Sequence, residues 1–225
     1  EGQGYSVDCH LDRGEDFAAP FAVTQNATFK DVIFTGVVNI VWGHSYLAGI
    51  VGYAKGTTRF SNCKVSSTLE CKNDASMDIS GGGFVGSGTD LIFENCVFDG
   101  KLIGANAYNC GGFVGWCSNS ATLTNCLFKP SEITFSSTGS YTFVRNGSLT
   151  LTNSYYTQAY GTAQGNQART ISAGTDTTIS GLGTPTATYT NAAAITAYSK
   201  GIKYNDVYYA GNGESVSLTL SHGDK

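Results

Sequence analysis

Apolar residues along this chain recur at positions i, i+3 and i+5. An amphipathic helix would place them at i, i+3, i+4 and i+7, and a simple half-buried strand at every second position. The observed spacing fits a strand that alternates, takes one extra residue and resumes with its phase shifted. The pattern occurs at Phe29, Val32 and Phe34, at Phe60, Cys63 and Val65, at Phe93, Cys96 and Phe98, and at Leu123, Cys126 and Phe128. It predicts β-strands that change direction at a fixed point.

The extra residue is always Asn or Asp, including in a further phrase at residues 151–154. Both residue types tolerate the left-handed backbone region, which marks a corner. The corner residues are Asp31, Asn62, Asn95, Asn125 and Asn153. Their steps of 31, 33, 30 and 28 residues are typical of a stacked repeat, in which amide side chains can hydrogen-bond along the stack. We therefore expect an all-β parallel β-helix of about five coils and give these residues a structural role.

A second phrase, Gly-hydrophobic-Val-Gly, lies between most of the corners. Its glycines are Gly49, Gly52, Gly83, Gly86, Gly112 and Gly115. We expect the phrase to form a second corner or a tight packing point, where Ile50, Phe84 and Phe113 point inward and glycine lets neighbouring coils approach closely. Residues 141–144 keep only the Phe-Val pair and form a degenerate last repeat, as edge repeats often do.

The glycine phrase followed by an apolar-x-Asn-Cys phrase resembles the GLUG-motif repeats of bacterial secreted and cell-surface proteins. The resemblance spans residues 28–157 and departs from the family at Ala48-Gly49 and at residues 141–144, both at the ends of the array. GLUG repeats occur in adhesin-like proteins and in non-catalytic regions of immunoglobulin A-specific proteases. The resemblance implies a right-handed β-solenoid, an extracellular or bacterial cell-surface location and no enzymatic activity of its own.

The repeats divide the chain into three segments. Residues 1–27 carry no repeat phrase and are expected to cover the exposed edge of the first coil, and residues 28–157 form the solenoid. Residues 158–225 are expected to hold irregular β or linker structure, then a hairpin with its turn at Gly211-Asn212-Gly213 and its second strand at 216–220. The hairpin is either a cap or the start of another module. The start at Glu1, without Met or a signal-like segment, indicates a piece of something longer.

Composition narrows the partner classes. The 225 residues are 13% charged with a net charge of −4, which lacks the basic excess used to bind nucleic acid or anionic lipid. No apolar run approaches the roughly 18 residues of a membrane helix, so membrane insertion is not expected. A hydrophobic content of 41% disfavours disorder.

Seven cysteines are an odd number, so at least one thiol is unpaired within the chain. Three of them, Cys63, Cys96 and Cys126, share one repeat position, and their parallel side chains favour a ladder of buried thiols over disulfides or a metal site. The other four lie outside this register, and a disulfide among them stays open: Cys9, Cys71, Cys110 and Cys117.

Candidate catalytic groups are scattered. Glycoside hydrolysis requires two carboxylates about 5 to 9.5 Å apart, but Glu94 and Asp99 have no acid at the same position of a neighbouring coil. We therefore interpret Asp99 as an isolated surface charge. A local acidic group is interpreted as solvated charge, with a cation site as the alternative. It consists of Asp74, Asp78 and Asp90. The three histidines match no catalytic spacing, and these are His10, His44 and His222. No catalytic residue, metal ligand or cofactor is predicted.

The residue after the glycine phrase is aromatic in two coils, at Tyr53 and Trp116, with Ser87 on the coil between them and Arg145 on the coil after. Two coils separate the aromatics by about 10 Å, a distance that suits two sugar rings. The alternative is that one or both rings only cover the stack beside Gly52 and Gly115.

The functional hypothesis is a non-enzymatic spacer or adhesion module of an exported bacterial surface protein that binds carbohydrate or a host surface protein weakly. A β-helical polysaccharide lyase or glycosidase is the alternative. A threonine-rich ice-binding face is disfavoured because its threonines align on only two coils. These are Thr122, Thr124, Thr150 and Thr152.

Overall fold

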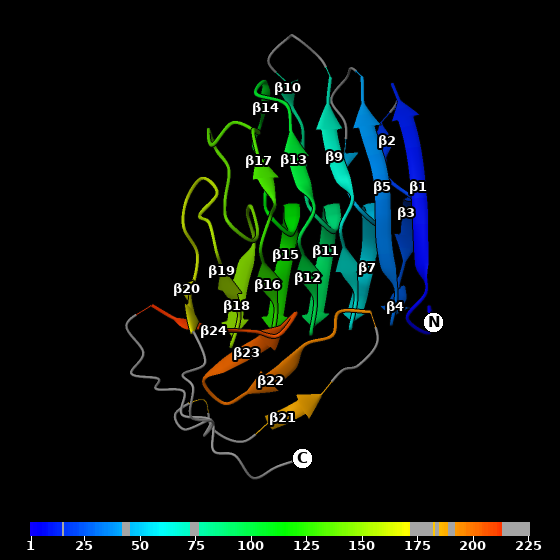
Figure 1. Ribbon diagram of the computed structural model, residues 1–225. Coiled ribbons are helices and arrows are strands. Elements are labelled where there is room, and N and C mark those ends of the chain that lie inside the picture. Colours follow the sequence, from blue (N-terminus) through cyan, green and yellow to red (C-terminus); the bar gives the residue numbers. More distant parts are fainter. Residues whose placement is uncertain are drawn as a thin grey trace.

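The chain folds entirely into β-structure over the residues that can be described. The computed structural model describes residues 1–14, 16–41, 46–72, 77–171, 182, 185–188 and 192–212. Short strands stack coil upon coil into a parallel β-solenoid of about five turns (Figure 1). The fold class predicted from the sequence is thereby confirmed.

One face of the solenoid is a six-stranded parallel sheet with one long strand from most coils. Its strands are β3 (Phe21–Gln25), β4 (Thr28–Lys30), β7 (Val51–Ser61), β11 (Val85–Glu94), β15 (Val114–Thr124) and β18 (Ser148–Thr152). The pairing keeps Phe60, Phe93 and Leu123 in one register position, so the apolar residues of successive coils lie directly over one another.

The second face contains the strands that follow each corner. They are β1 (Ser6–Arg13), β5 (Ile33–Ile40), β8 (Lys64–Val65), β9 (Thr68–Cys71), β12 (Val97–Phe98), β13 (Lys101–Ile103), β16 (Leu127–Phe128), β17 (Glu132–Ile133) and β19 (Tyr155–Tyr156). A third side has only short pairs. These are β2 (Phe17–Ala18) with β6 (Tyr46–Leu47), and β10 (Met77–Asp78) with β14 (Ala107–Tyr108).

The core is a set of stacked aromatic rings. Phe60 and Phe93 lie 4.8 Å apart between ring centroids at an interplanar angle of 6°, and Phe84 and Phe113 lie 4.7 Å apart at 15°. The separation matches the strand spacing of about 4.8 Å, because each coil contributes one ring per position. Cys96 is fully buried between its two coils, as the i, i+3, i+5 pattern requires.

The five Asn and Asp positions lie where the first face ends and the second begins, with φ between 46° and 54°. Their side chains are joined along the stack: Asn153 Nδ2 donates to Asn125 Oδ1 at 2.8 Å, Asn125 Nδ2 donates to Asn95 Oδ1 at 3.0 Å, and Asn62 Nδ2 donates to Asp31 Oδ1. The chain of bonds is interrupted once, because Asn62 Oδ1 accepts the backbone N–H of Ala193 and the buried Asn95 Nδ2 has no partner among the described residues.

The first glycine of each phrase lies in a tight packing point. A Cβ atom on Gly83 would lie 2.3 Å from the carbonyl oxygen of Gly112 and 2.6 Å from the Phe98 ring. A Cβ on Gly49 would lie 2.3 Å from the carbonyl oxygen of Gly83. No side chain fits at such distances, so the phrase keeps glycine here for close approach between coils.

The thiols of Cys63, Cys96 and Cys126 are buried in one column, and no disulfide joins any of the seven cysteines. The neighbouring Cys96 thiol and burial raise the pKa of Cys63, and burial above all raises the pKa of Cys96. The Cys63 and Cys96 thiols are therefore protonated packing groups.

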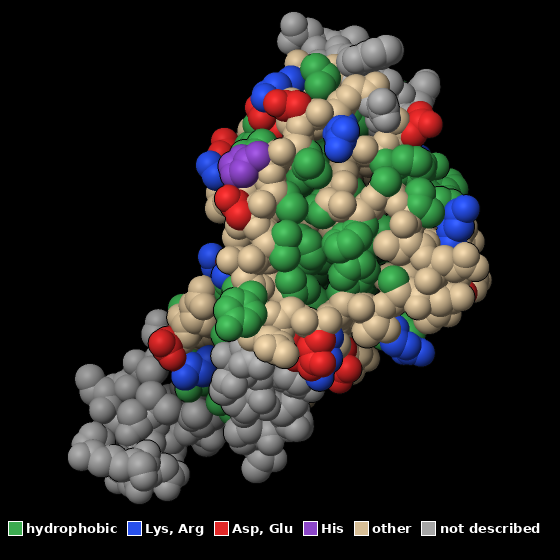
Figure 2. Space-filling view, turned by 90° about the vertical axis from the view of Figure 1, so that its right-hand side faces the viewer, with side chains coloured by type: hydrophobic (Ala, Val, Ile, Leu, Met, Phe, Trp, Pro, Cys, Tyr) green, Lys and Arg blue, Asp and Glu red, His purple; other side chains and the backbone are tan. Residues whose placement is uncertain are grey.

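Residues before position 28 follow the path of a further coil. β1 pairs in parallel with β5 over eight residues, and Gly4, with φ 80°, stands at the register position of Asp31. Inward-facing Val7 and Phe21 are 42% and 45% exposed because no strand lies beside this edge among the described residues. Figure 2 looks onto this end and shows apolar side chains gathered at its centre.

The C-terminal part forms an antiparallel sheet against the corner side of the solenoid, across the lower part of Figure 1. Its strands are β20 (Asn166–Ile171), β21 (Pro185–Thr188), β22 (Thr196–Tyr198), β23 (Gly201–Tyr204) and β24 (Val207–Gly211). The β23–β24 turn lies at Asn205 and Asp206, with φ 47° and 58° as a two-residue primed turn requires. The predicted turn at 211–213 is therefore not the one that joins these strands, and the predicted strand 216–220 lies outside the described residues.

Asp99 is not the isolated surface charge that the sequence suggested. Its carboxylate lies 3.1 Å from Lys64 Nζ, accepts the Tyr204 hydroxyl at 2.7 Å and accepts the Ser66 hydroxyl at 2.5 Å. Tyr204 belongs to a cluster that packs on outward-facing Val97. The interpretation was wrong because a segment about a hundred residues away in the sequence covers this carboxylate.

Candidate ligand-binding groove

A groove of about 530 Å³ opens on the third side of the solenoid. Its lining residues come from successive coils: Asp16, Phe17, Tyr46, Asp78, Ser80, Trp116 and Arg145. The groove therefore runs along the stack, and neighbouring positions along it are separated by about one strand spacing.

The second glycine of each phrase makes room for a residue of the preceding coil, for its side chain at Gly52 and Gly86 and for its backbone at Gly115. A Cβ atom on Gly52 would lie 2.9 Å from the Phe17 ring, and one on Gly86 would lie 2.7 Å from Tyr46 Cβ. A Cβ on Gly115 would lie 2.4 Å from the backbone of Ser80. The three glycines thus form one column of seats, occupied in turn by Phe17, Tyr46 and Ser80.

The first two seats hold stacked rings. Phe17 and Tyr46 are direct register partners, and their rings lie 5.5 Å apart at 23°. Ser80 holds the same position in the next coil, because Ala48 bridges Gly82 and both Tyr46 and Ser80 lie two residues before these bridged positions. A hydroxymethyl group therefore stands where the two preceding coils place a ring, and the groove opens at this point.

The predicted aromatic pair contributes in two different ways. Tyr53, Ser87 and Trp116 occupy one register position in successive coils. Trp116 lines the groove and is 37% exposed, whereas Tyr53 is not a lining residue. The Tyr53 ring stacks on Tyr46 at 6.1 Å and 16°, so it supports the ring that does line the groove.

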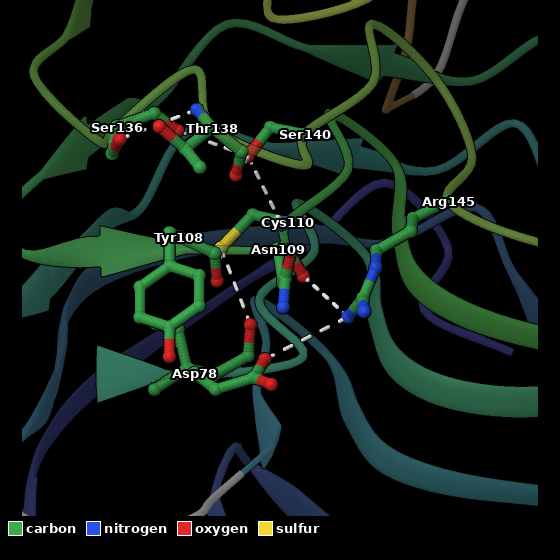
Figure 3. A network of polar contacts seen from close by, with 9 residues as sticks. Asp78, Tyr108, Asn109, Cys110, Ser136, Thr138, Ser140 and Arg145 are labelled. Atoms are coloured by element: carbon green, nitrogen blue, oxygen red, sulfur yellow. Dashed lines mark hydrogen bonds and ion pairs between the residues drawn. The ribbon is translucent and has the colours of Figure 1, made fainter. Parts of the chain in front are cut away.

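Arg145 is held in place by three contacts, of which Figure 3 shows those to Asp78 and Asn109. Its guanidinium lies 4.9 Å from the centre of the Trp116 ring, Nη1 lies 3.8 Å from Asp78 Oδ1, and Nη1 donates to the carbonyl oxygen of Asn109 at 2.9 Å. The expected alignment of Arg145 with Trp116 is shifted by one residue, because Val144 bridges Val114. The long side chain nevertheless reaches back over the indole.

A buried network behind Arg145 fixes the strand that carries Asp78 (Figure 3). The Cys110 thiol donates to the carbonyl oxygen of Ile79 at 3.4 Å, and its backbone N–H donates to Ser140 Oγ at 3.1 Å. Ser140 Oγ in turn donates to the carbonyl oxygen of Ser136 at 2.9 Å. Burial raises the pKa of Cys110 to about 12, so this thiol stays protonated and structural.

The charges of the groove come from two carboxylates and one cation. Asp16 and Asp78 contribute −2 and Arg145 contributes +1, which gives the lining a formal charge of −1. Part of the Arg145 charge is already engaged by Asp78. The arrangement offers hydrogen-bond acceptors beside three aromatic rings, those of Phe17, Tyr46 and Trp116, which is a common composition for a small-molecule site.

The remaining candidate groups do not join the groove. Asp90 accepts hydrogen bonds from Asn119 and Ser120 at 2.6 and 2.7 Å, and His10 lies 3.2 Å from Asp8. Asp74, His44 and His222 lie outside the described residues. Within the described ranges, no three His, Cys, Asp or Glu side chains gather closely enough to hold a metal ion.

Sequence reasoning missed Asp16, Phe17, Tyr46 and Ser80. A usable signal exists, because Phe17-Ala18-Ala19 and Tyr46-Leu47-Ala48 are both aromatic-apolar-Ala phrases. They precede the long strands β3 and β7 at similar distances. This third phrase is weaker than the other two because it occurs in only two coils and Ser80 replaces its aromatic residue in the next.

No helix in the described ranges has the length and apolar character of a membrane span. Comparison with protein-family models, with curated proteins and with solved structures returned no match.

Proposed function

We propose that this chain is a non-enzymatic spacer and adhesion module of an exported bacterial surface protein, and that it binds an extended glycan weakly in the groove. The observation that carries the proposal is the pairing of Tyr46 and Trp116 with the carboxylates of Asp16 and Asp78 in one elongated hollow. The resemblance of the glycine phrases to GLUG-motif repeats supports the surface location and the absence of catalysis.

The groove chemistry suits a polyhydroxylated chain. Aromatic rings present flat apolar faces to the C–H faces of sugars, and carboxylate oxygens accept hydrogen bonds from hydroxyl groups. A solenoid offers such contacts at regular intervals along its axis. With few polar contacts in an open groove, we expect a dissociation constant on the order of 0.1 to 1 mM, which corresponds to about −4 to −5.5 kcal/mol.

A glycan array followed by calorimetric titration tests this function. Trp116→Ala is expected to weaken binding of the best glycan at least about tenfold. The substitution removes one ring surface and also the ring that lies beside the Arg145 guanidinium. Tyr5→Ala is the matched control, since Tyr5 is an exposed aromatic residue at 74% and does not line the groove. Absence of binding to every glycan, or equal binding by parent and Trp116→Ala, would refute glycan binding in this groove.

A second candidate is a β-helical glycosidase, favoured by the presence of Asp16 and Asp78 in the same groove. Glycoside hydrolysis uses two carboxylates, one as the acid and one as the base or nucleophile. Incubation of the parent with array-positive polysaccharides, with a reducing-end assay, separates the two functions. Release of new reducing ends that Asp16→Asn and Asp78→Asn abolish would establish the enzyme, and no release is expected for the adhesion module.

A further inference from the structure

We infer that the part of the groove beside Ser80 is a subsite for one uncharged pyranose ring, in contact with Tyr46. The inference rests on the proposed glycan-binding function and names the class of sugar that the groove accepts. It depends on three observations: an interrupted stack of rings, polar groups that line the same hollow, and the engaged charge of Arg145.

The interrupted stack supplies the shape. Phe17 and Tyr53 both stack on Tyr46, at ring distances of 5.5 and 6.1 Å, and Ser80 replaces the ring that the register would place next in the column after Phe17 and Tyr46. The space at Gly115 is filled by the backbone of Ser80 and Gly81, so the room left by the missing ring belongs to the groove that Tyr46 and Ser80 line. The hollow can therefore take one flat group beside Tyr46, which a pyranose ring supplies through its C–H face.

The surrounding polar atoms favour a sugar over an aromatic side chain. Ser80 and the carboxylates of Asp16 and Asp78 line the same hollow as Tyr46, so hydrogen-bond acceptors share this hollow with the apolar ring. A pyranose carries hydroxyl donors around its whole edge, whereas an aromatic side chain has at most one polar atom there. An aromatic side chain would leave most of these acceptors without a donor.

The charges favour a neutral sugar. Arg145 is the cation among the groove-lining residues, and its guanidinium is already held by Asp78, by the carbonyl oxygen of Asn109 and by the Trp116 ring. The carboxylate of a uronic or sialic acid would meet two aspartates and would have to displace Asp78 to reach Arg145. Like charges at short distance disfavour that complex.

Two substitutions that add the same ring test the subsite. Ser80→Phe is expected to complete the stack, to fill the seat and to weaken binding at least about tenfold. Ser148→Phe adds a ring at an exposed position of β18 outside the groove and is expected to leave affinity unchanged. The probes are cellohexaose, laminarihexaose and mannohexaose as neutral chains, and hexagalacturonate as an anionic chain of equal length, each titrated calorimetrically.

We expect at least one neutral hexasaccharide to bind the parent about tenfold or more tightly than hexagalacturonate does. Tighter binding of hexagalacturonate would overturn the charge assignment. Binding that Trp116→Ala weakens and Ser80→Phe does not would overturn the subsite while leaving the proposed function intact. Failure of the parent to bind any saccharide would overturn both.

Thermal melting gives a readout without any ligand. Ser80→Phe is expected to raise the melting temperature above that of the parent, since a ring would extend the stack that Phe17 and Tyr46 begin. A lowered melting temperature in Ser80→Phe, with Ser148→Phe unchanged, would show that the seat does not accept a ring and would contradict the inference on its own.

Discussion

Two columns of side chains run along this solenoid, and they differ in how faithfully the sequence repeats them. The corner column, at Asp31, Asn62, Asn95, Asn125 and Asn153, keeps an amide or carboxylate in each coil from residue 28 onward. The ring column, at Phe17, Tyr46 and Ser80, begins with two stacked rings and then loses the third. In the corner column, neighbouring side chains hydrogen-bond to one another at every step except that between Asn62 and Asn95. Where the ring column is interrupted, the apolar and polar groups of the groove are left for a ligand.

The two columns also differ in what covers them. The C-terminal sheet lies on the corner column, where the Ala193 N–H donates to Asn62 and Asn153 Nδ2 donates to the carbonyl oxygens of Tyr198 and Gly201 at 3.0 and 3.2 Å. The ring column is open to solvent at the groove. Substitutions in the covered corner column are therefore expected to change the stability of the fold, and substitutions in the open ring column are expected to change ligand binding.

The strongest test of the corner column is Asn125→Ala. Asn125 donates to Asn95 and accepts from Asn153, and its φ of 53° is unfavourable for alanine. Two lost hydrogen bonds and the backbone penalty together should lower the free energy of unfolding by about 3 kcal/mol. Asn125→Gly loses the same hydrogen bonds but adopts this φ without strain, so comparing it with Asn125→Ala separates the hydrogen-bond loss from the backbone penalty. A urea midpoint for Asn125→Ala equal to that of the parent would remove the structural role of the column.

Asp99→Ala tests the cover on the corner column. It leaves Lys64 and the hydroxyl of Tyr204 without their shared carboxylate, and we expect a loss of about 2 kcal/mol in chemical denaturation. Glu94→Ala is the control, because Glu94 is an exposed acid in the same coil and should cost less than about 0.5 kcal/mol. Equal effects of the two substitutions would mean that the C-terminal sheet does not dock on Asp99.

The pH dependence of stability gives a smaller, directional effect. Burial and then the hydrogen bond to the Asp99 carboxylate raise the pKa of Tyr204 above that of an ordinary tyrosine. The stability linked to this proton is complete below about pH 10 and is lost as the pH rises toward the folded-state pKa, by about 1.4 kcal/mol per pH unit. Unfolding of the parent and of Tyr204→Phe between pH 9 and 11 should therefore show a steeper decline in the parent. Parallel pH profiles would contradict this.

The corner and the core could be predicted because each repeat contains, within a few neighbouring residues, the residue types that form them. The positive φ needed at the corner selects Asn or Asp within one phrase, and burial at i, i+3 and i+5 selects apolar residues around it. The turn at Asn205 and Asp206, which joins β23 and β24, was not predicted, although both residue types tolerate the left-handed conformations that it needs. The predicted hairpin with its turn at 211–213 extends outside the described residues and stays a prediction.

Only part of the groove could be predicted, because it depends on the missing ring at the Ser80 position and on contacts between segments that are distant in the sequence. Trp116 was visible from its repeat position, but the role of Tyr53 as a support for Tyr46 follows from stacking across coils. Ser80 belongs to no sequence motif. Its position in the ring column follows only from the strand register, which places it after Phe17 and Tyr46. Asp99 and Tyr204 are 105 residues apart, a pairing that no periodicity contains.

The contrast between the two columns is tested most directly by nuclear magnetic resonance titration with a neutral hexasaccharide that binds. The account predicts shifts of the Trp116 indole N–H and of the backbone amide of Ser80, while the side-chain amides of Asn125 and Asn153 stay in place. Shifts confined to the corner amides, or spread equally over both columns, would contradict the claim that the interrupted column is the binding site and the continuous column is the structural one.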